Sequence, residues 1–274
     1  MILNREDKTK LKQQLKRTAK GWGLNLIGFA NVERWAEERM TAEAFYPQNI
    51  WPWAKTVIVL GAKIYLPMLE TTPSVVYSEL YNTTNRMLDE LSYQMANLLN
   101  QSGFRAFFFP RDCYGDISVL VQKPEAAFSH VIAAKYAGLG MIGMNHTLLT
   151  REYGPRVRLV SVITDAEIHP DPIIREELCI LCGRCVNACP QKALTRRDNE
   201  LVAEMDKFKC AAYHEQLKHE FRYPCGVCTA VCPVGMDRKL YGMRSVTEQG
   251  VKHVRSFGAN SQELRDSADA HITY

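Results

Sequence analysis

The order of apolar and polar positions predicts four strands in the first 165 residues. Residues 24–32 alternate between the two classes, as expected for a half-buried strand. Residues 55–62 and 156–164 are continuous runs rich in β-branched side chains, a pattern typical of strands that are buried on both faces. A short aromatic strand is expected at 104–109, before Pro110.

Helical spacing of apolar residues predicts three helices among these strands. Residues 5–20 combine a basic face with a thin apolar stripe, which indicates a surface helix or a docking site for an acidic partner. Residues 80–98 repeat apolar side chains every three or four positions, and residues 125–136 form the third segment. Together, the strands and helices indicate an α/β layer structure.

A change in composition near residues 166–175 divides the chain. The segment His169-Pro170-Asp171-Pro172 is followed by short loops that are rich in cysteine and poor in apolar residues. We therefore expect an α/β cofactor domain at 1–168 and a ferredoxin-like domain at 169–242. The polar stretch 243–274 is expected to be a tail that packs on the surface.

Composition and charge narrow the class of protein. The chain has 274 residues, of which 46% are hydrophobic, so it can bury a core and is not disordered, collagenous or coiled-coil. The net charge is +4, but the first twenty residues alone carry about +5, and the remainder is close to neutral. This distribution predicts no basic face for nucleic acid. The apolar runs are too short for a membrane span, and residues 1–8 do not resemble an export signal, so we expect a cytoplasmic protein without a membrane partner.

The cysteines are concentrated in one part of the chain. Eight of the nine lie between Cys179 and Cys232, and only Cys113 lies outside. The first segment reads C-x2-C-x2-C-x3-C-P, and the second reads C-x2-C-x3-C-P with Cys210 upstream. Because disulfide frameworks spread cysteines over a short secreted chain, this clustering indicates metal binding. Cys113 is expected to be a free thiol.

The spacing is that of bacterial two-cluster ferredoxins, in which the cysteine before proline ligates the other cluster. A zinc ribbon is the alternative, although tetrahedral zinc requires neither the run of three cysteines nor the proline. Applying the ferredoxin pattern gives two [4Fe–4S] clusters with four thiolates each. The predicted ligands are Cys179, Cys182, Cys185 and Cys232 for cluster 1, and Cys189, Cys210, Cys225 and Cys228 for cluster 2.

The order of several short segments resembles the epoxyqueuosine reductases and the related reductive dehalogenases. The matching segments are residues 16–32, Pro52–Val59, Ala137–Asn145, Arg151–Gly154 and Lys209–Glu215. The resemblance implies a nitroreductase-like cobalamin-binding domain followed by the two clusters, with base-off cobalamin between them. It also implies that electrons pass from cluster to cobalt to substrate.

The same resemblance suggests which residues contact the cofactor. Gly138-Leu139-Gly140-x-x-Gly143 matches the part of the family that lines the cofactor cavity, and its glycines would let backbone approach a flat macrocycle. A dinucleotide site is excluded by context, because a helix precedes the segment and no acidic residue follows at the required distance. The expected cofactor-binding residues are Gly138, Leu139, Gly140, Gly143, Asn145, His146 and Tyr81.

The chain departs from the family at the proton donor. The family carries an aspartate where this chain has Gln122, and an amide does not deliver a proton. The sequence therefore does not identify the catalytic residue. The candidates are Gln122, Asp112 and Glu125, and Asp116 is a further acid nearby. The polar loop 111–116 is expected to form the rim of the cavity.

These patterns support three hypotheses about function. The first is a corrinoid-dependent reductase that receives electrons from a ferredoxin or flavodoxin and reduces a small molecule. The second is an electron-transfer or activating protein that reduces a corrinoid or a corrinoid protein. The third is an iron–sulfur protein whose first domain holds a flavin or nothing. The sequence argues against tRNA as a partner, because it shows neither a helical-repeat extension nor a basic surface.

Overall fold

An antiparallel four-stranded sheet forms the centre of the computed structural model, which describes residues 5–198 and 200–240. The strands lie in the order β1 (Leu26–Asn31), β2 (Thr56–Lys63), β6 (Val157–Thr164) and β3 (Ala106–Phe109), and all three pairs are antiparallel. All four predicted strands are therefore present. The predicted α/β class holds as a mixed helix and sheet fold, but not as a parallel βαβ layer. The predicted tail at 243–274 lies outside the described residues.

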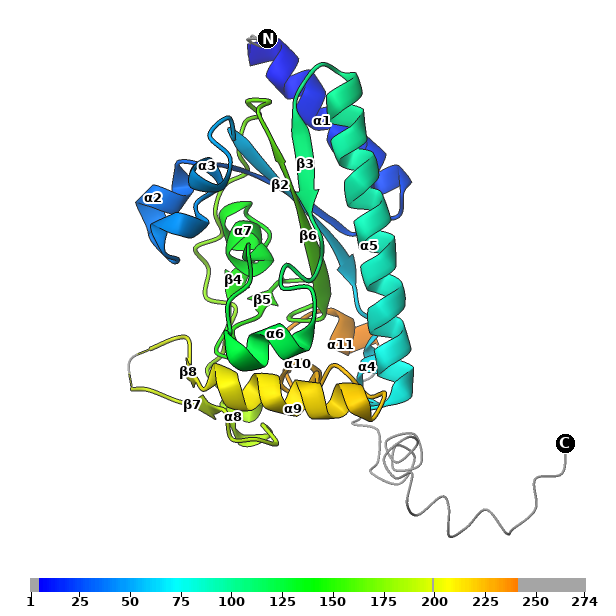
Figure 1. Cartoon of the computed structure of the whole chain (residues 1–274), viewed down its shortest axis with the longest axis vertical. Helices are drawn as coiled ribbons and strands as arrows, with labels where there is room; N and C mark the ends of the chain where they lie inside the picture. Colours follow the sequence, from blue (N-terminus) through cyan, green and yellow to red (C-terminus); the bar gives the residue numbers. More distant parts are fainter. Residues whose placement is uncertain (1–4, 199, 241–274) are drawn as a thin grey trace, which may run out of the picture.

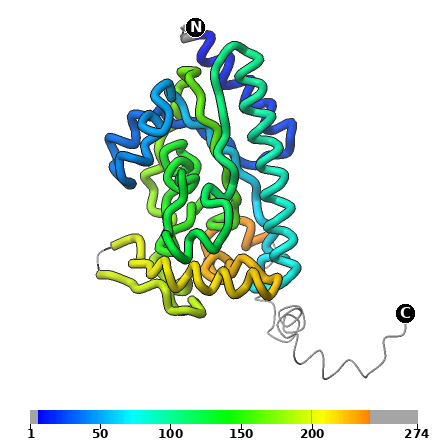
Figure 2. The backbone as a smooth tube through the Cα atoms, in the orientation of Figure 1, coloured from blue at the N-terminus to red at the C-terminus, as the bar shows by residue number. Residues whose placement is uncertain are grey.

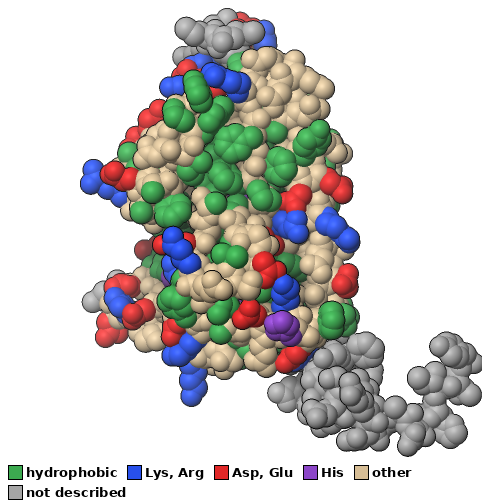
Figure 3. Space-filling model, in the orientation of Figure 1, with side chains coloured by type: hydrophobic (Ala, Val, Ile, Leu, Met, Phe, Trp, Pro, Cys, Tyr) green, Lys and Arg blue, Asp and Glu red, His purple; other side chains and the backbone are tan. Residues whose placement is uncertain are grey.

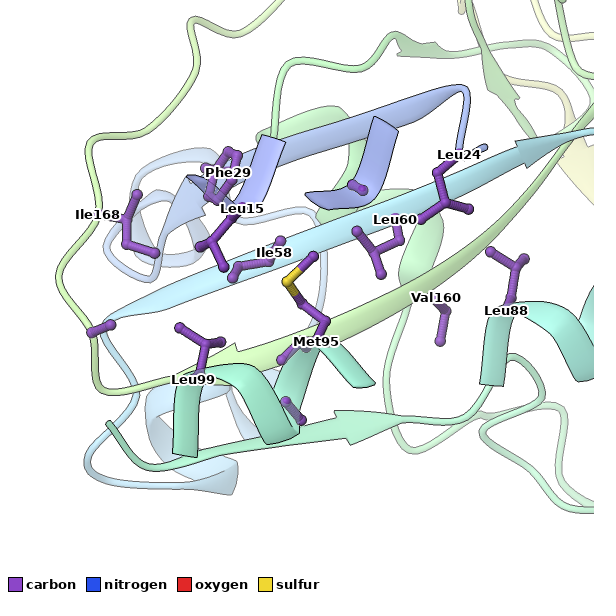
Figure 4. Packing of buried hydrophobic residues seen from close by; sticks show 14 of the residues in the cluster. Leu15, Leu24, Phe29, Ile58, Leu60, Leu88, Met95, Leu99, Val160 and Ile168 are labelled. Atoms are coloured by element: carbon purple, nitrogen blue, oxygen red, sulfur yellow. The ribbon is translucent and has the colours of Figure 1, made fainter. Parts of the chain in front are cut away.

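Helices cover both faces of the sheet, as Figures 1 and 2 show. On one face, α1 (Arg5–Gly21) and α5 (Val75–Gln101) enclose the larger core, in which Ile58 and Leu60 of β2 meet Met95 of α5 (Figure 4). Val57 and Val59 point to the other face, where α7 (His130–Tyr136) packs. Every residue of β2 from 56 to 62 is buried, which explains its continuous apolar sequence.

The remaining elements are mostly short and lie beside the sheet and around its end far from the N-terminus. In Figure 1 the ferredoxin-like part lies at the end opposite the N-terminus, with α9 packed against α6. These elements are α2 (Arg34–Glu38), η1 (Glu43–Phe45), α3 (Pro47–Ile50), α4 (Leu66–Leu69), α6 (Ile117–Gln122), β4 (Met141–Ile142), β5 (Leu148–Leu149), α8 (Arg184–Asn187), β7 (Leu194–Thr195), β8 (Glu204–Met205), α9 (Lys207–His219), α10 (Val227–Ala230) and α11 (Asp237–Leu240).

Capping residues explain where two predicted helices differ from the structure. The helix expected at 125–136 begins only at His130, because Ser129 caps it and its Oγ accepts a hydrogen bond from the backbone N of Ile132 at 3.3 Å. The helix expected at 80–98 extends from residue 75 to 101, with Ser74 as the N-cap. The apolar pattern locates the helices, while the caps set their ends.

Asp171 holds the segment that links the two parts of the chain. Its carboxylate pairs with Lys12 at 2.8 Å and Lys16 at 3.0 Å, and it accepts a hydrogen bond from the backbone N of Phe29 at 3.2 Å. The backbone N of Asp171 donates in return to the Phe29 oxygen at 2.8 Å. Asp171 therefore fastens the linker both to α1, through the two lysines, and to β1, through Phe29.

No helix in the described ranges has the length and apolar character that crossing a membrane requires.

Replacing Asp171 with Ala should lower the free energy of unfolding by about 1–3 kcal/mol, because it leaves the backbone N of Phe29 and two lysines without their acceptor. Urea unfolding of the cluster-loaded protein measures the change. Glu167→Ala is the matched control, since Glu167 is 67% exposed and pairs with Lys8 of the same helix at 2.7 Å. The control should cost about 0–1 kcal/mol. Equal losses for the two variants would contradict the role given to Asp171.

Candidate redox cofactor site

The two cysteine segments share one local backbone conformation. In each, a glycine after a cysteine has a positive φ, +70° at Gly183 and +63° at Gly226, and a four-residue helix follows at once. Glycine adopts this left-handed conformation without steric cost, which lets the chain turn sharply between two cysteines. The two short helices, α8 and α10, contact each other. The sequence pseudo-repeat is therefore also a structural repeat.

A small cavity beside α8 is lined by cysteines from both segments. They are Cys179, Cys182, Cys185 and Cys232. Cys182 is exposed and the other three are half-buried. Burial raises the pKa of both the Cys185 and the Cys232 thiols, and the charge of neighbouring thiols adds to the rise. Thiolates are ligands that iron–sulfur clusters and zinc both take, so four cysteines lining one cavity suit either kind of centre.

A second cavity, of about 980 Å³, is lined by the other four cysteines. They are Cys189, Cys210, Cys225 and Cys228. Burial raises the pKa of Cys210 to about 11 and that of Cys225 and Cys228 to about 12. Buried thiols without a cation would stay protonated, whereas a bound metal stabilises the thiolate. Each predicted ligand set thus lines a single cavity.

Residues of the first domain fasten the second cysteine segment. Thr72 Oγ1 donates to the Cys225 oxygen, and Asn145 Nδ2 donates to the Cys228 oxygen at 3.2 Å. A Cβ at Gly226 would lie 2.5 Å from the Tyr77 ring, so this loop packs directly on α5. The larger cavity is consequently formed by both parts of the chain.

A hydrogen-bonded polar cluster lines the same cavity. Asp112 Oδ1 accepts from Tyr81 Oη at 3.0 Å, from Tyr114 Oη at 3.3 Å and from Arg158 Nη2 at 3.3 Å. The Tyr114 and Tyr223 hydroxyl oxygens are 2.7 Å apart. The Arg158 guanidinium also lies over the Tyr81 ring, 4.3 Å from its centroid. We call these five residues the tyrosine cluster.

Burial keeps the phenols of Tyr114 and Tyr223 protonated. It raises the pKa of Tyr114 and of Tyr223, and the nearby Tyr81 and Asp112 add to the rise. These hydroxyl groups therefore retain their protons at neutral pH while facing a cavity large enough for a ligand.

Cys113 and His130 also line the cavity, as a neutral pair. Cys113 Sγ lies 3.2 Å from His130 Nε2, and His130 Nδ1 lies 2.9 Å from Ser161 Oγ. Burial raises the pKa of Cys113 to about 12 and lowers that of His130 to about 4. Neither the thiolate nor the imidazolium is favoured, so this is not an activated cysteine nucleophile.

Three of the predicted cofactor-binding residues line the larger cavity: Tyr81, Asn145 and His146. His146 Nε2 lies 2.6 Å from the Ala203 oxygen, which fixes its ring. His214 of α9 lines the cavity as well, and its contact within the described residues is with the Tyr223 ring at 5.5 Å between centroids. His214 therefore keeps its ring nitrogens free for a bound molecule.

The glycine segment does not line the cavity, contrary to the prediction. A Cβ at Gly138 would lie 2.2 Å from the Pro172 oxygen, and a Cβ at Gly140 would lie 2.1 Å from the Leu149 oxygen. At Gly143 it would meet the Leu149 side chain at 2.6 Å, and Leu139 packs in the core beside α7. These glycines make room for neighbouring parts of the protein itself rather than for a macrocycle.

The candidate acids occupy different positions. Gln122, at the end of α6, is exposed and does not line the cavity, whereas Asp112 does. Glu125 lies at the cavity but is exposed and pairs with Lys123 at 2.8 Å. Asp116 caps α6, where its Oδ1 accepts from Ser118 N at 3.0 Å. Asp112 is thus the candidate acid that the fold places in a hydrogen-bond network facing the cavity.

The sequence prediction missed Arg158 and Tyr223. The signal for Arg158 was an arginine within a run that otherwise reads as a strand buried on both faces, since such a charge requires partners. Tyr223 lies in a loop after α9 and carries no comparable signal. Tyr114 belongs to the predicted loop 111–116, but its pairing with Tyr223 was not foreseen.

Comparison with known proteins agrees with the geometry of the cysteine segments. Residues 178–236 match the model of a 4Fe-4S dicluster domain. The chain is 29% identical over 193 residues to a tetrachloroethene reductive dehalogenase of Desulfitobacterium hafniense, covering 65% of this chain and 32% of that protein. It is 27% identical over 262 residues to an epoxyqueuosine reductase of Bacillus cereus, covering 84% and 67%.

Solved structures of both groups share the fold. A reductive dehalogenase described as B12-dependent superimposes with a TM-score of 0.63 at 18% identity, covering 88% of this chain and 35% of that one. An epoxyqueuosine reductase of Bacillus subtilis gives 0.57 at 22% identity, covering 84% and 66%. This chain thus spans about a third of the length of the dehalogenases. The chain therefore shares its fold with the epoxyqueuosine reductases and the reductive dehalogenases, and it is similar to both groups in sequence.

Proposed function

We propose that the chain is an iron–sulfur reductase in which two [4Fe–4S] clusters serve a corrinoid bound in the larger cavity. Cluster 1 is held by Cys179, Cys182, Cys185 and Cys232, and cluster 2 by Cys189, Cys210, Cys225 and Cys228. The match to a dicluster domain favours iron–sulfur over zinc. The exposed Cys182 favours entry of electrons at cluster 1, from a ferredoxin or flavodoxin.

One observation carries the proposal: the same cavity of about 980 Å³ is lined by the four cysteines of cluster 2 and by the tyrosine cluster. Electrons that leave cluster 2 would therefore reach a molecule already in contact with hydrogen-bond donors. His214, for which the described part of the chain shows a ring contact with Tyr223 but no hydrogen bond, and the fixed Asn145 and His146 suit the amide-rich rim of a corrinoid. When bound, the corrinoid supplies a low-potential metal centre that reduces the substrate.

Within this cavity, the chain's own residues orient the ligand and hold the proton. Asp112 accepts three hydrogen bonds and so acts as the fixed anion of the tyrosine cluster. Tyr114 and Tyr223 keep their protons because burial raises their pKa. A phenol held in this way can give up its proton to an anion that forms on a reduced substrate, and it would replace the carboxylic acid lost at Gln122.

Two alternatives share the cysteine chemistry but differ in the larger cavity. In one, the protein passes electrons to a corrinoid protein without a substrate of its own; in the other, the cavity holds a flavin. The large cavity behind cluster 2 favours a small-molecule cofactor bound within this chain. The face in Figure 3 interleaves Lys and Arg with Asp and Glu, which gives no support to tRNA as the substrate.

Anaerobically reconstituted protein should contain about eight irons per chain. Cys228→Ser and Cys185→Ser should each reduce the iron content toward four, because each removes a thiolate from one cluster only. Cys113→Ser is the control and should keep the full content. Iron and zinc are measured by elemental analysis, and about two zinc ions with little iron would refute the cluster assignment.

Titration with cob(II)alamin should produce a base-off EPR signal with micromolar affinity. Ala211 lines the cavity from α9, so the larger side chain of Ala211→Trp would occupy space that the cobalamin needs. This substitution should weaken the affinity for cob(II)alamin at least tenfold. Retention of eight irons by the variant would show that the clusters are intact. Tight binding of flavin mononucleotide without binding of cobalamin would instead select the flavin alternative.

Tyr114→Phe should slow reduction of a model epoxide or haloarene by about 10²–10⁴-fold while cob(II)alamin affinity changes little. Tyr93→Phe, at an exposed tyrosine of α5, is the control. Unchanged turnover in Tyr114→Phe and in Tyr223→Phe would show that neither phenol supplies the proton.

A further inference from the structure

We propose that the charged group formed by Arg156, Arg238, Asp237 and Glu70 tunes the reduction potential of cluster 1. The inference rests on the ligand sets proposed above. It concerns residues that lie behind the cluster ligands rather than the ligands themselves.

Arg156 lies just before β6 and is fully buried. Each nitrogen of its guanidinium group donates at least one hydrogen bond. Its Nε and Nη2 donate to the two carboxylate oxygens of Asp237, both at 2.6 Å. Its Nη1 donates to the Cys232 oxygen at 3.1 Å and its Nη2 to the Val234 oxygen at 2.5 Å. A Cβ at Gly235 would lie 2.4 Å from Nη2, so the glycine there leaves the space that the guanidinium fills.

A second guanidinium reaches the same carbonyl group. Arg238 Nε donates to the Cys232 oxygen at 3.2 Å, and its Nη1 pairs with Glu70 at 2.8 Å. Cys232 thus has two cationic donors on its peptide oxygen while its thiol faces the small cavity of cluster 1.

The donors to cluster 2 ligands are neutral. The Cys225 oxygen accepts from the hydroxyl of Thr72, and the Cys228 oxygen accepts from the amide of Asn145. The two clusters have the same ligand chemistry and the same turn geometry, and only the cluster 1 ligand Cys232 has charged donors on its peptide oxygen among these hydrogen bonds of the described residues.

Charge of this kind acts directly on a one-electron couple. When one electron enters a [4Fe–4S] cluster, its net charge becomes more negative by one, and a buried cation stabilises the reduced form. The guanidinium groups of Arg156 and Arg238 therefore favour the reduced form of cluster 1, and the carboxylates of Asp237 and Glu70 favour its oxidised form. Removing a cation and removing an anion must shift this potential in opposite directions.

The test is an EPR-monitored potentiometric titration of the two-cluster protein with dithionite as reductant. Arg238→Gln keeps a hydrogen-bond donor and removes one positive charge, so it should lower the midpoint of one cluster. Asp237→Asn keeps the size of the side chain and removes the negative charge, so it should raise the same midpoint. A tenfold change in the reduction equilibrium, which is about 59 mV for one electron, is the expected size of each shift.

Arg105→Gln is the matched control, because Arg105 lies at the start of β3 and pairs with Asp165 at 2.7 Å. It makes the same change in net charge and should leave both midpoints in place. Opposite shifts of a single midpoint support the proposal, since a purely structural defect would not change sign with charge. Eight irons with unmoved midpoints overturn this inference alone, whereas low iron in the wild-type protein overturns the ligand assignment on which it rests.

Discussion

Burial of the Arg156 guanidinium is the constraint on which the join between the two parts of the protein depends. A charge with no exposed surface must be paired and hydrogen-bonded, and its partners here all come from residues 232–237. The chain is thereby drawn back from α10 to the start of β6. This return places Cys232 beside Cys179–Cys185, so the ligand that is most distant in sequence completes the smaller cavity.

The larger cavity lies between the two parts of the chain, and residues of both parts line it. Its cysteines come from the ferredoxin-like part, whereas Tyr81, Asp112, Tyr114 and Arg158 come from the first domain. In the proposed reductase, electrons would reach this cavity through the cysteines of cluster 2, and Tyr114 and Tyr223 would hold the protons.

Local sequence patterns predicted much of this architecture. The features that they did not predict depend on contacts between residues that are far apart in the sequence. The four strands and the two cysteine sets were readable because each depends on periodicity or spacing within a short segment. The antiparallel order was not readable, because it depends on connections that the apolar pattern does not encode. The glycines at 138–143 were assigned to a cofactor because sequence cannot distinguish close approach to a ligand from close approach to Pro172 and Leu149. The tyrosine cluster was only partly foreseen, since Arg158 and Tyr223 are 65 residues apart and meet only in the folded chain.

Asn145 has a further significance, because it lines both cavities. Its side-chain nitrogen holds the Cys228 peptide, and its oxygen accepts from Thr147 Oγ1 at 2.8 Å. One amide group is thus part of the wall of each cavity. A substitution at position 145 would therefore change the wall of both cavities at once.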